Sequence, residues 1–400
     1  MIPFSPPYIN DDIIKEVTEA LRSGWITTGP KTKLLEKTVA EYVGVQHVLC
    51  LNSATAALEI ILRWFGVDEN DEVIVPVYTY SATANVVMHC NAKLVLVDVN
   101  ADDFNIAVDK VRAAITARTK VIMPVDFAGY PCDFDALNSL VNEPEINAQF
   151  TPRTAEQKQL GRILILSDAA HSLGATYKGK RTGSLCDATA FSFHAVKNLT
   201  TAEGGALCLN FPAPFDNAAI YKQLYIKTLH GQTKDALAKT QKGAWEYDII
   251  EPGYKCNMAD IAAAIGLAQF RVYESEIEPR RREIMKAYHT AFSNHPKFIA
   301  PVFETTDRVS SFHLYPLLVK DASLQERNAI LQRIFDQDVS VNVHFKPIPL
   351  LSYYAGLGYK IADYPIANSL WEREISLPVY AGLSDDQVQQ VIAAVLKAVE

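Results

Sequence analysis

Ser192-Phe-His-Ala-Val-Lys197-Asn-Leu-Thr-Thr-Ala-Glu-Gly-Gly-Ala206 places one lysine in a polar segment between two apolar runs. The runs on either side, Asp187 to Phe191 and Gly205 to Leu209, are typical of buried strands. We therefore expect Lys197 to lie on a tight connection between two strands and to point into a cleft. Because burial lowers the pKa of a lysine amine, such a residue can bond covalently to an aldehyde.

An acidic residue upstream supplies a partner for this lysine. Ser167-Asp168-Ala-Ala-His171-Ser-Leu-Gly174 follows the apolar run Ile163 to Leu166. An acid at the end of a strand, followed downstream by a lysine, is the arrangement expected for pyridoxal phosphate. The acid keeps the ring nitrogen protonated and the lysine holds the aldehyde. Since most single lysines are solvated surface charges, the pairing with Asp168 carries this prediction.

Short apolar runs alternate with helical patterns between residues 45 and 210. The expected helices include 54–65 and 81–90, and the expected strands are 47–51, 72–76, 93–98, 119–124, 163–166, 188–193 and 205–209. This alternation predicts an α/β fold with a mostly parallel sheet. Ligands bind at the carboxyl ends of the strands in such sheets. Asn52, Ser53, Tyr80 and Asp168 all follow strand ends and are expected to converge there.

The second half of the chain predicts a smaller α+β unit. A long helical pattern runs from Met258 towards Tyr288, strand-like runs cover 314–319 and 340–345, and a last helix covers 384–399, capped by Ser384 or Asp385. We predict a large cofactor-binding domain over 1–255 and an interface helix with a small domain over 256–400. Residues 141–162 are polar and aperiodic, which favours a surface insertion, with a functional lid as the alternative.

Composition and charge exclude several classes of protein. Hydrophobic residues make up 49% of the chain, charged residues 21%, and the formal net charge is -8. These values describe an ordinary globular protein without a basic surface for nucleic acid or an anionic membrane. The six cysteines are scattered without metal-ligand spacing, so we expect buried free thiols and no metal. Without a signal peptide or a long apolar run, the chain is expected to be soluble and cytoplasmic.

A small-residue segment offers a place for a phosphate. Asn52-Ser53-Ala54-Thr55 ends an expected strand and opens an expected helix, where free backbone N–H groups and the helix dipole favour an anion. A plain Ser/Thr helix cap explains the same residues equally well. Tyr80 follows another strand and could stack on the pyridine ring, although a core tyrosine is the simpler interpretation.

In this order, Asn-Ser-Ala-Thr, an aromatic residue, Asp-Ala-Ala-His and Ser-Phe-His-x-x-Lys form a specific combination. The chain resembles the DegT/DnrJ/EryC1/StrS sugar aminotransferases, which are fold-type I pyridoxal-phosphate enzymes. The resemblance runs nearly end to end and includes Ser23 to Pro30, Pro252 to Ile261 and Ser376 to Tyr380. Within the family, the chain looks most like enzymes that aminate C4 of UDP-4-keto sugars, such as the 4-amino-4-deoxy-arabinose synthase.

The resemblance implies a seven-stranded-type sheet and a role for each matching residue. Lys197 would hold the cofactor aldehyde and move a proton, Asp168 would pair with the ring nitrogen, and His171 would lie at the ring oxygen. Tyr80 would stack on the ring. The phosphate would be held by Ser53, Ala54, Thr55 and Ser192, and by Asn257 of the neighbouring subunit, in a homodimer with shared active sites. The candidate sugar contacts are Trp25, His194, His344 and Phe345.

The family's activity implies that glutamate donates its amine, leaving pyridoxamine phosphate. The amine then passes to a keto group of a nucleotide-linked sugar for lipopolysaccharide or another surface polysaccharide. Amination at C3 is one alternative. Another is a pyridoxamine-phosphate dehydratase, disfavoured because those relatives replace the lysine that is present here as Lys197. A non-catalytic regulatory protein is disfavoured by the intact Asp168, His171 and Lys197.

Two departures from the family pattern leave the sugar contacts open. Asp126, in Pro124 to Gly129, stands where relatives often have histidine, and the 141–162 insertion is longer than expected. His344 stands where relatives often have a histidine near the sugar nucleotide, but a structural histidine explains that position as well.

Overall fold

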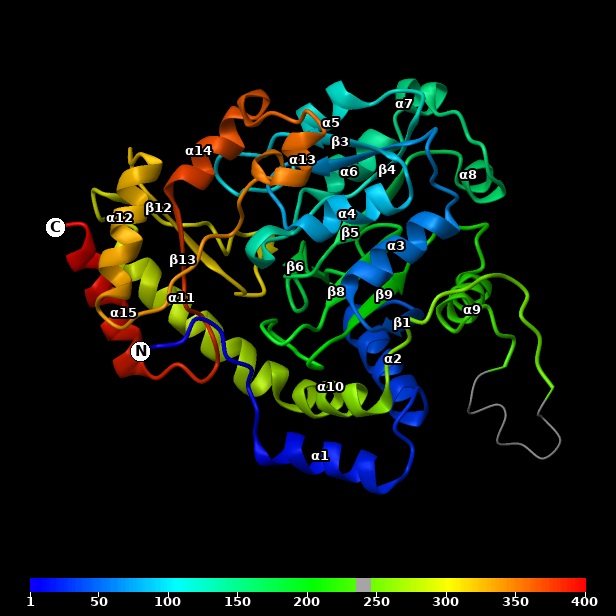
Figure 1. The fold of residues 1–400 in the computed structure, drawn as a ribbon, viewed down its shortest axis with the longest axis horizontal. Helices are drawn as coiled ribbons and strands as arrows, with labels where there is room; N and C mark the ends of the chain where they lie inside the picture. The colour runs from blue at the N-terminus through cyan, green and yellow to red at the C-terminus, as the bar shows by residue number, and fades with distance from the viewer. Residues whose placement is uncertain (235–245) are drawn as a thin grey trace.

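The centre of the fold is a large mixed sheet in a computed structural model that describes residues 1–234 and 246–400. Within those residues the sheet has seven strands in the order β1-β9-β8-β5-β4-β2-β3 (Figure 1). The strands are β1 His47–Leu51, β2 Glu72–Pro76, β3 Lys93–Val97, β4 Thr119–Ile122, β5 Leu164–Asp168, β8 Ala188–Ser192 and β9 Gly205–Leu209. Only β9 runs antiparallel to its neighbours β1 and β8. The predicted α/β fold with a mostly parallel sheet is confirmed.

Helices cover both faces of this sheet, which explains the unbroken apolar runs of its strands. Val73 and Val75 of β2 join one buried cluster with α3 and α4, whereas Ile74 between them joins another with α5 and α6. A third cluster packs α2 and α10 against β1 and β9. The covering helices are α2 Pro30–Val43, α3 Ala54–Trp64, α4 Ser81–His89, α5 Val108–Ala114, α6 Phe134–Val141, α9 Asn217–Thr228 and α10 Asp260–Val272. Helix α1 Asp11–Arg22 packs on α10.

The 141–162 segment differs from its prediction as an aperiodic insertion. It forms two short helices, α7 Pro144–Gln149 and α8 Ala155–Leu160, that pack on the large domain. Ile146 and Phe150 are buried, and the buried Gln157 donates its side-chain N–H to the Phe65 carbonyl. These helices were not predicted because the segment has too few buried apolar residues to show a helical pattern. Because the segment leads into the amino end of β5, it lies away from the carboxyl ends where ligands bind, which removes the support for a lid.

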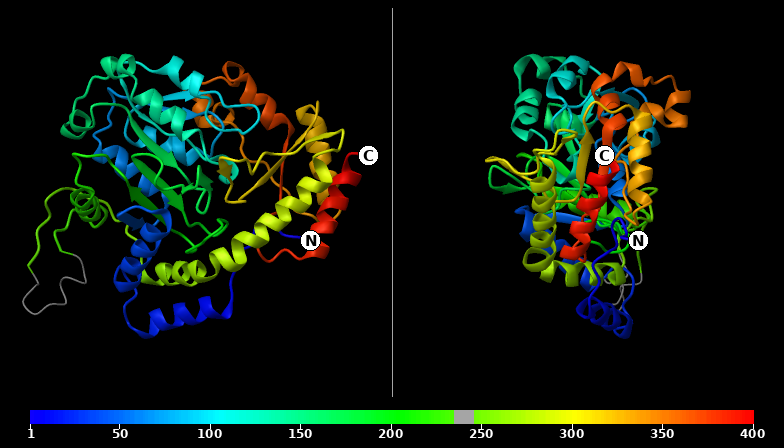
Figure 2. Two further views of the ribbon diagram at one scale, coloured as in Figure 1. Left: turned by 180° about the vertical axis from the view of Figure 1, so that it is seen from behind. Right: turned by 90° about the vertical axis from the view of Figure 1, so that its left-hand side faces the viewer.

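A smaller sheet, of order β10-β12-β13 among the described residues, lies at the other end of the molecule with both chain termini (Figures 1 and 2). Its core also contains Ile2. The elements around it are α11 Glu278–Phe292, β10 Phe298–Ile299, β12 Tyr315–Val319, α12 Leu324–Phe335, β13 Glu374–Leu377 and α15 Asp385–Ala398. Two further helices, α13 Ser352–Gly356 and α14 Pro365–Arg373, bury their apolar side chains in the large core. Three two-residue strands, β6 Thr176–Tyr177, β7 Lys180–Arg181 and β11 Arg308–Val309, form a third sheet.

Two C-terminal predictions are confirmed and one is wrong. The run at 314–319 forms β12, and Ser384 caps α15 in a capping box with Gln387. The strand expected over 340–345 does not form. That segment makes only single bridges, from Val339 to Ile2 and from Asn342 to Ser376. It leaves the edge of β13 after one bridge, and so carries His344 and Phe345 towards the large sheet.

The long helical pattern after Met258 consists of α10 and α11, joined by the π-helical turn Tyr273–Ile277. Figure 2 shows this rod running from the large sheet to the small one. Helix α10 packs against α1 and α2, whereas α11 contributes to the small core. The division at residues 255 and 256 stays a prediction. Among the described residues, no helix has both the length and the apolarity needed to cross a bilayer.

Candidate active site

A cavity of about 400 Å³ lies where β2, β5 and β8 end. The sequence-predicted residues that line it come from both halves of the chain. They are Ser53, Ala54, Thr55, Tyr80, Asp168, His171, Ser192, His194, Lys197, His344 and Phe345. Trp25 and Asn257 do not line this cavity of their own chain. The convergence expected from the parallel topology is therefore present.

Lys197 lies on the connection between β8 and β9. A turn, in which the Lys197 N–H donates to the His194 carbonyl at 2.9 Å, closes the loop locally. Phe193 and Gly204 pair across its base, with the Phe193 N–H donating at 2.9 Å. Burial lowers the pKa of Lys197 to about 8, an effect that the charge of Asp168 opposes. The amine is therefore more often neutral, and so nucleophilic, than that of a surface lysine.

Asp168 ends β5 and is held from two sides. The Thr83 hydroxyl donates to Oδ2 at 2.7 Å, and the Ala170 N–H donates to Oδ1 at 3.2 Å. Burial raises the pKa of Asp168, while these hydrogen bonds and Lys197 oppose the rise. The side chain is thus positioned to pair with a cationic group in the cavity. Thr83 was not predicted from the sequence, because one threonine within a helix carries no readable signal.

The start of α3 forms an anion cradle. Ser53 caps the helix, its Oγ accepting from the Ala56 N–H at 3.1 Å, so the cap interpretation holds. The amides of Ala54 and Thr55 have no acceptor within the helix and suit a phosphate. At Gly205 of β9, a Cβ would lie 2.4 Å from the Ala54 nitrogen. Glycine there allows β9 to pass close behind the cradle.

His171 has a buried ring nitrogen without a hydrogen-bond partner among the described residues. Its ring lies between His313, with centroids 4.4 Å apart, and Phe345, at 5.7 Å. Burial and the charge of Lys197 lower the pKa of His171 well below its usual range, so the ring is neutral. Its buried Nδ1 has no partner among the described residues. Since buried polar atoms are normally paired, a ligand group is expected there. This orphaned atom, the α3 cradle and the Asp168–Lys197 pair together fit pyridoxal phosphate.

His313 lines the cavity but was not predicted. The Asn198 Nδ2 donates to the Ser311 carbonyl at 2.6 Å, so its Oδ1 must accept from His313 Nδ1 at 2.8 Å. The proton of the neutral ring is therefore on Nδ1, which leaves Nε2 as an acceptor. Burial lowers the pKa of His313 well below its usual range, which keeps the ring neutral. Its sequence context, Ser-Ser-Phe-His, gave no signal of this contact.

Aromatic and imidazole rings form the wall of the cavity that faces the small sheet. His344 stacks on Phe4, with ring centroids 5.5 Å apart, and Phe345 lies 5.8 Å from the exposed Tyr80. The N-terminal segment continues along the cavity, where the Ser5 hydroxyl donates to the Val196 carbonyl at 3.2 Å. His194 is exposed at the cavity surface, near Glu203. These side chains offer apolar and polar contacts suited to a small polar molecule.

Asp126 lies outside the lining residues and has a structural role. Its Oδ2 accepts from the Ser172 hydroxyl at 2.7 Å and its Oδ1 from the Cys132 N–H at 2.9 Å. Burial raises the pKa of Asp126 to about 6. By holding Ser172, Asp126 fixes the turn that follows Asp168 and contains His171. Asp126 therefore supports the site from behind and does not line this cavity.

The motifs around Trp25 and Asn257 meet each other in the folded chain. The Trp25 indole N–H donates to the Thr28 carbonyl at 3.2 Å, and the Asn257 amide donates to the Thr28 hydroxyl. Asp260 caps α2 by accepting from the Gly29 N–H at 2.8 Å. Asn257 does not cap α10, whose N-cap residue is Ala259. A contact of Asn257 with a neighbouring subunit stays a prediction.

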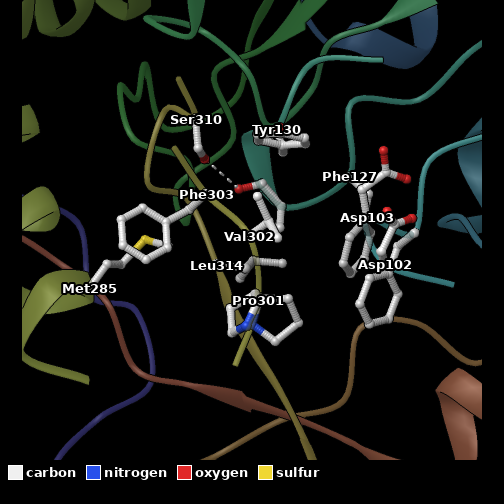
Figure 3. A pocket seen from close by; sticks show the side chains of 13 residues that line it. Asp102, Asp103, Phe127, Tyr130, Met285, Pro301, Val302, Phe303, Ser310 and Leu314 are labelled. Atoms are coloured by element: carbon white, nitrogen blue, oxygen red, sulfur yellow. Dashed lines mark hydrogen bonds between the residues drawn. The ribbon is translucent and has the colours of Figure 1, made fainter. Parts of the chain in front are cut away.

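A second, much smaller cavity lies between the two cores (Figure 3). Phe127 and Tyr130 line it from the large domain, and Val302 and Leu314 from the other side. Its volume of about 10 Å³ is close to the minimum that holds one water molecule. It is a packing gap rather than a ligand site.

A seven-stranded sheet with an aspartate and a lysine at its strand ends, beside an anion cradle, defines a fold-type I pyridoxal-phosphate enzyme. The chain belongs to the DegT/DnrJ/EryC1/StrS aminotransferase family, whose model matches residues 7–150 and 152–396. The predicted family, fold and cofactor are thus confirmed. The particular kinship with the arabinose synthase stays a prediction.

Individual relatives match over nearly their whole length. The spore coat polysaccharide biosynthesis protein SpsC of Bacillus subtilis is 39% identical over 98% of this chain and 96% of its own. The putative sugar aminotransferase Spr1654 of Streptococcus pneumoniae, in its PMP form, matches with a TM-score of 0.96 and 48% identity over 100% of this chain and 99% of its own. Helicobacter pylori PseC, an aminotransferase involved in pseudoaminic acid biosynthesis, matches with a TM-score of 0.85 and 28% identity over 99% of this chain and 98% of its own.

Proposed function

We propose that this aminotransferase moves an amino group from glutamate to a keto group, at C4, of a nucleotide-linked sugar used for a surface polysaccharide. The observation that carries the proposal is Lys197 beside Asp168 in one cavity, because a transaminase needs both groups. The sugar as substrate class is supported by Spr1654 and PseC, and the polysaccharide by SpsC. A dehydratase of this fold is disfavoured by the presence of the lysine.

Pyridoxal phosphate, when bound, supplies an aldehyde that takes up the amine and a ring that withdraws electrons. Lys197 Nζ would hold that aldehyde and transfer the proton at the substrate carbon. Asp168 would keep the ring nitrogen protonated, and His171 Nδ1 would bond the ring oxygen. The cradle at Ser53, Ala54 and Thr55, with Ser192, would hold the phosphate.

The sugar would occupy the part of the cavity away from α3. His194, His344 and Phe345 would border it there, and Tyr80 would stack on the cofactor ring. With substrate bound, the apolar rings of this wall would limit access of water and so protect the reaction from side reactions. Trp25, which does not line the cavity of its own chain, would act only across a subunit interface.

We propose a homodimer with shared sites as the working assembly. Tyr247, Ile249 and Ile250 are large apolar side chains that are about half exposed, close in sequence to Asn257. A cluster of exposed apolar residues favours an interface. Asn257 would reach the cofactor phosphate of the neighbouring subunit across it.

The test is to incubate purified protein with glutamate and a panel of nucleotide-linked 3-keto and 4-keto sugars. A product with an amine in place of the keto oxygen, with equimolar 2-oxoglutarate, is the expected result, and its position follows from fragmentation. Bleaching of the visible absorbance by glutamate alone tests the donor half-reaction separately. Loss of a hydroxyl without amine transfer would instead identify the dehydratase, and no bleaching would exclude glutamate as donor.

A further inference from the structure

A buried carboxyl group lies directly behind His344. Glu374, the first residue of β13, has 0% exposure. Its Oε2 accepts from the backbone N–H of His344 at 2.9 Å. Its Oε1 forms a short hydrogen bond with the Ser376 hydroxyl. None of the functions described above uses this carboxyl group.

Ser376 connects this carboxyl group to the imidazole ring. Its Oγ lies 2.8 Å from His344 Nδ1. The Tyr78 hydroxyl fixes the backbone by donating to the His344 carbonyl at 2.9 Å, and Phe4 stacks on the ring. Because Nδ1 is bonded to Ser376 and the ring lines the cavity, Nε2 is the ring nitrogen left for a ligand.

The proton on Glu374 determines the direction of this chain of hydrogen bonds. When the carboxyl is charged, the Ser376 hydroxyl donates to it and accepts from His344 Nδ1–H, so Nε2 is an acceptor. When the carboxyl is protonated, Oε1–H donates to Ser376, which then donates to Nδ1. The ring proton is in that case on Nε2, which becomes a donor.

We propose that Glu374 is a positioning residue that, through Ser376, sets whether His344 offers the substrate a hydrogen-bond donor or an acceptor. The ligand group would be a hydroxyl or keto oxygen of the sugar, so this part rests on the proposed function. His313 provides the contrast within the same cavity. Its partner Asn198 can only accept from it, so that ring has one fixed tautomer.

We call the hydrogen-bonded chain Glu374–Ser376–His344 the relay. The charges around it support a switch within a pH range in which the protein can be measured. Burial raises the pKa of Glu374 to about 8, against the opposing charge of Arg327 on α12. Burial and Lys197 lower the pKa of His344 to about 3, so His344 stays neutral throughout. The raised pKa of Tyr78 keeps its hydroxyl protonated. His344 is thus a donor below about pH 8 and an acceptor above it.

Nitrogen NMR of protein labelled at histidine tests the relay without any substrate. The two ring nitrogens have distinct shifts when protonated and unprotonated, and the spectrum of His344→Gln assigns the signals. In the wild type, the proton should move from Nε2 to Nδ1 between about pH 6 and about pH 10, two units either side of the pKa. A His344 tautomer that stays constant over this range would overturn the proposal.

Variants locate the cause of the switch. Glu374→Gln keeps both hydrogen bonds, because its carbonyl accepts from His344 and its amide donates to Ser376, so it should hold the Nε2–H tautomer at every pH. Ser376→Ala should uncouple the ring from residue 374. Glu372→Gln, a nearby carboxyl that instead bonds Asn368, is the matched control and should titrate like the wild type. A switch retained in Glu374→Gln would overturn the proposal.

Kinetics then test the consequence for the sugar. In the wild type, KM for the sugar should change severalfold across pH 8. This change in KM should be absent in Glu374→Gln, whereas the change in kcat that follows the titration of Lys197 should remain in both proteins. If NMR shows the tautomer switch but the protein aminates no nucleotide-linked sugar, the proposed function is contradicted and the role of Glu374 stands. If the protein aminates the sugar but NMR shows no tautomer switch, the proposed function stands and the role of Glu374 is contradicted.

Discussion

The two walls of the cavity are built in different ways. The wall formed by the large sheet places Ser53, Asp168 and Lys197 directly at or after strand ends, and each lies in a contiguous motif. The opposite wall collects Phe4, His313 and His344 from irregular segments far apart in the chain. The first wall therefore follows from the topology of a parallel sheet, whereas the second depends on how separate segments pack. Five substitutions can break or sharpen this comparison.

Lys197→Ala should produce the largest effect. Transamination should fall by more than ~10³-fold, because the residue supplies both the covalent link and the proton transfer. Turnover with glutamate and keto sugar measures the loss, and the absorbance of the covalently held cofactor should disappear. Lys178→Ala, which removes an exposed lysine paired with Asp135, is the control. More than a tenth of normal turnover in Lys197→Ala would show that Lys197 is not the catalytic lysine.

Asp168→Asn should reduce turnover by about 10²-fold or more, equivalent to several kcal/mol in the barrier. A neutral amide cannot stabilise a protonated ring nitrogen, although the hydrogen bond from Thr83 can persist. Cofactor binding, followed by absorbance titration, should survive. Normal kinetics in this variant would mean that another acid performs the role.

Gly205→Ala tests whether the cradle depends on close approach of the backbone. The added Cβ would lie 2.4 Å from the Ala54 nitrogen, so α3 must shift. Overpacking costs about 1–3 kcal/mol, and we expect cofactor affinity to fall about tenfold. Gly356→Ala, where nothing lies within 4 Å, is the matched control. Unchanged affinity in Gly205→Ala would show that the cradle tolerates the shift.

Asn257→Ala tests whether a second subunit contributes to the cavity wall formed by the large sheet. Cofactor affinity should fall by up to about tenfold through a lost phosphate contact, with little change in the melting of the cofactor-free protein. Mixing this variant with inactive Lys197→Ala gives heterodimers in which one site carries both lesions and the other is intact. At a cofactor concentration too low to load the Asn257→Ala homodimer, activity should therefore rise on subunit exchange. No rise, with exchange verified by native mass spectrometry, would place Lys197 and Asn257 of one subunit in the same site and contradict the shared-site proposal.

Phe4→Ala should have the smallest effect, confined to the second wall. Loss of the stacked ring loosens His344 and should raise KM for the sugar about threefold, within the range of one aromatic pair. The rate of bleaching by glutamate should not change. An equal effect on both half-reactions would mean that the two walls do not divide the substrates.

The predictable part of the molecule follows the same division. The positions of the large-sheet strands along the chain and the convergence of Ser53, Tyr80 and Asp168 followed from apolar periodicity and from the rule that ligands bind at carboxyl strand ends. Lys197 was predicted from its pairing with Asp168, and the order of the strands within the sheet was not predicted. His313 was missed because its role depends on Asn198, which is distant in sequence. The strand expected over 340–345 failed because alternation alone does not show whether a partner strand is available. Asp260, which caps α2 from another part of the chain, carries no local signal either.

The N-terminal segment has a practical consequence for expression and engineering of the enzyme. Ile2 is buried in the small core, where its N–H donates to the Asp338 carbonyl and its own carbonyl accepts from the Ser340 N–H. Trimming a clone to the first helix, at Asp11, would remove this anchor together with Phe4. Affinity tags belong at the other terminus, because an extension ahead of the exposed Met1 begins only a few residues from the cavity.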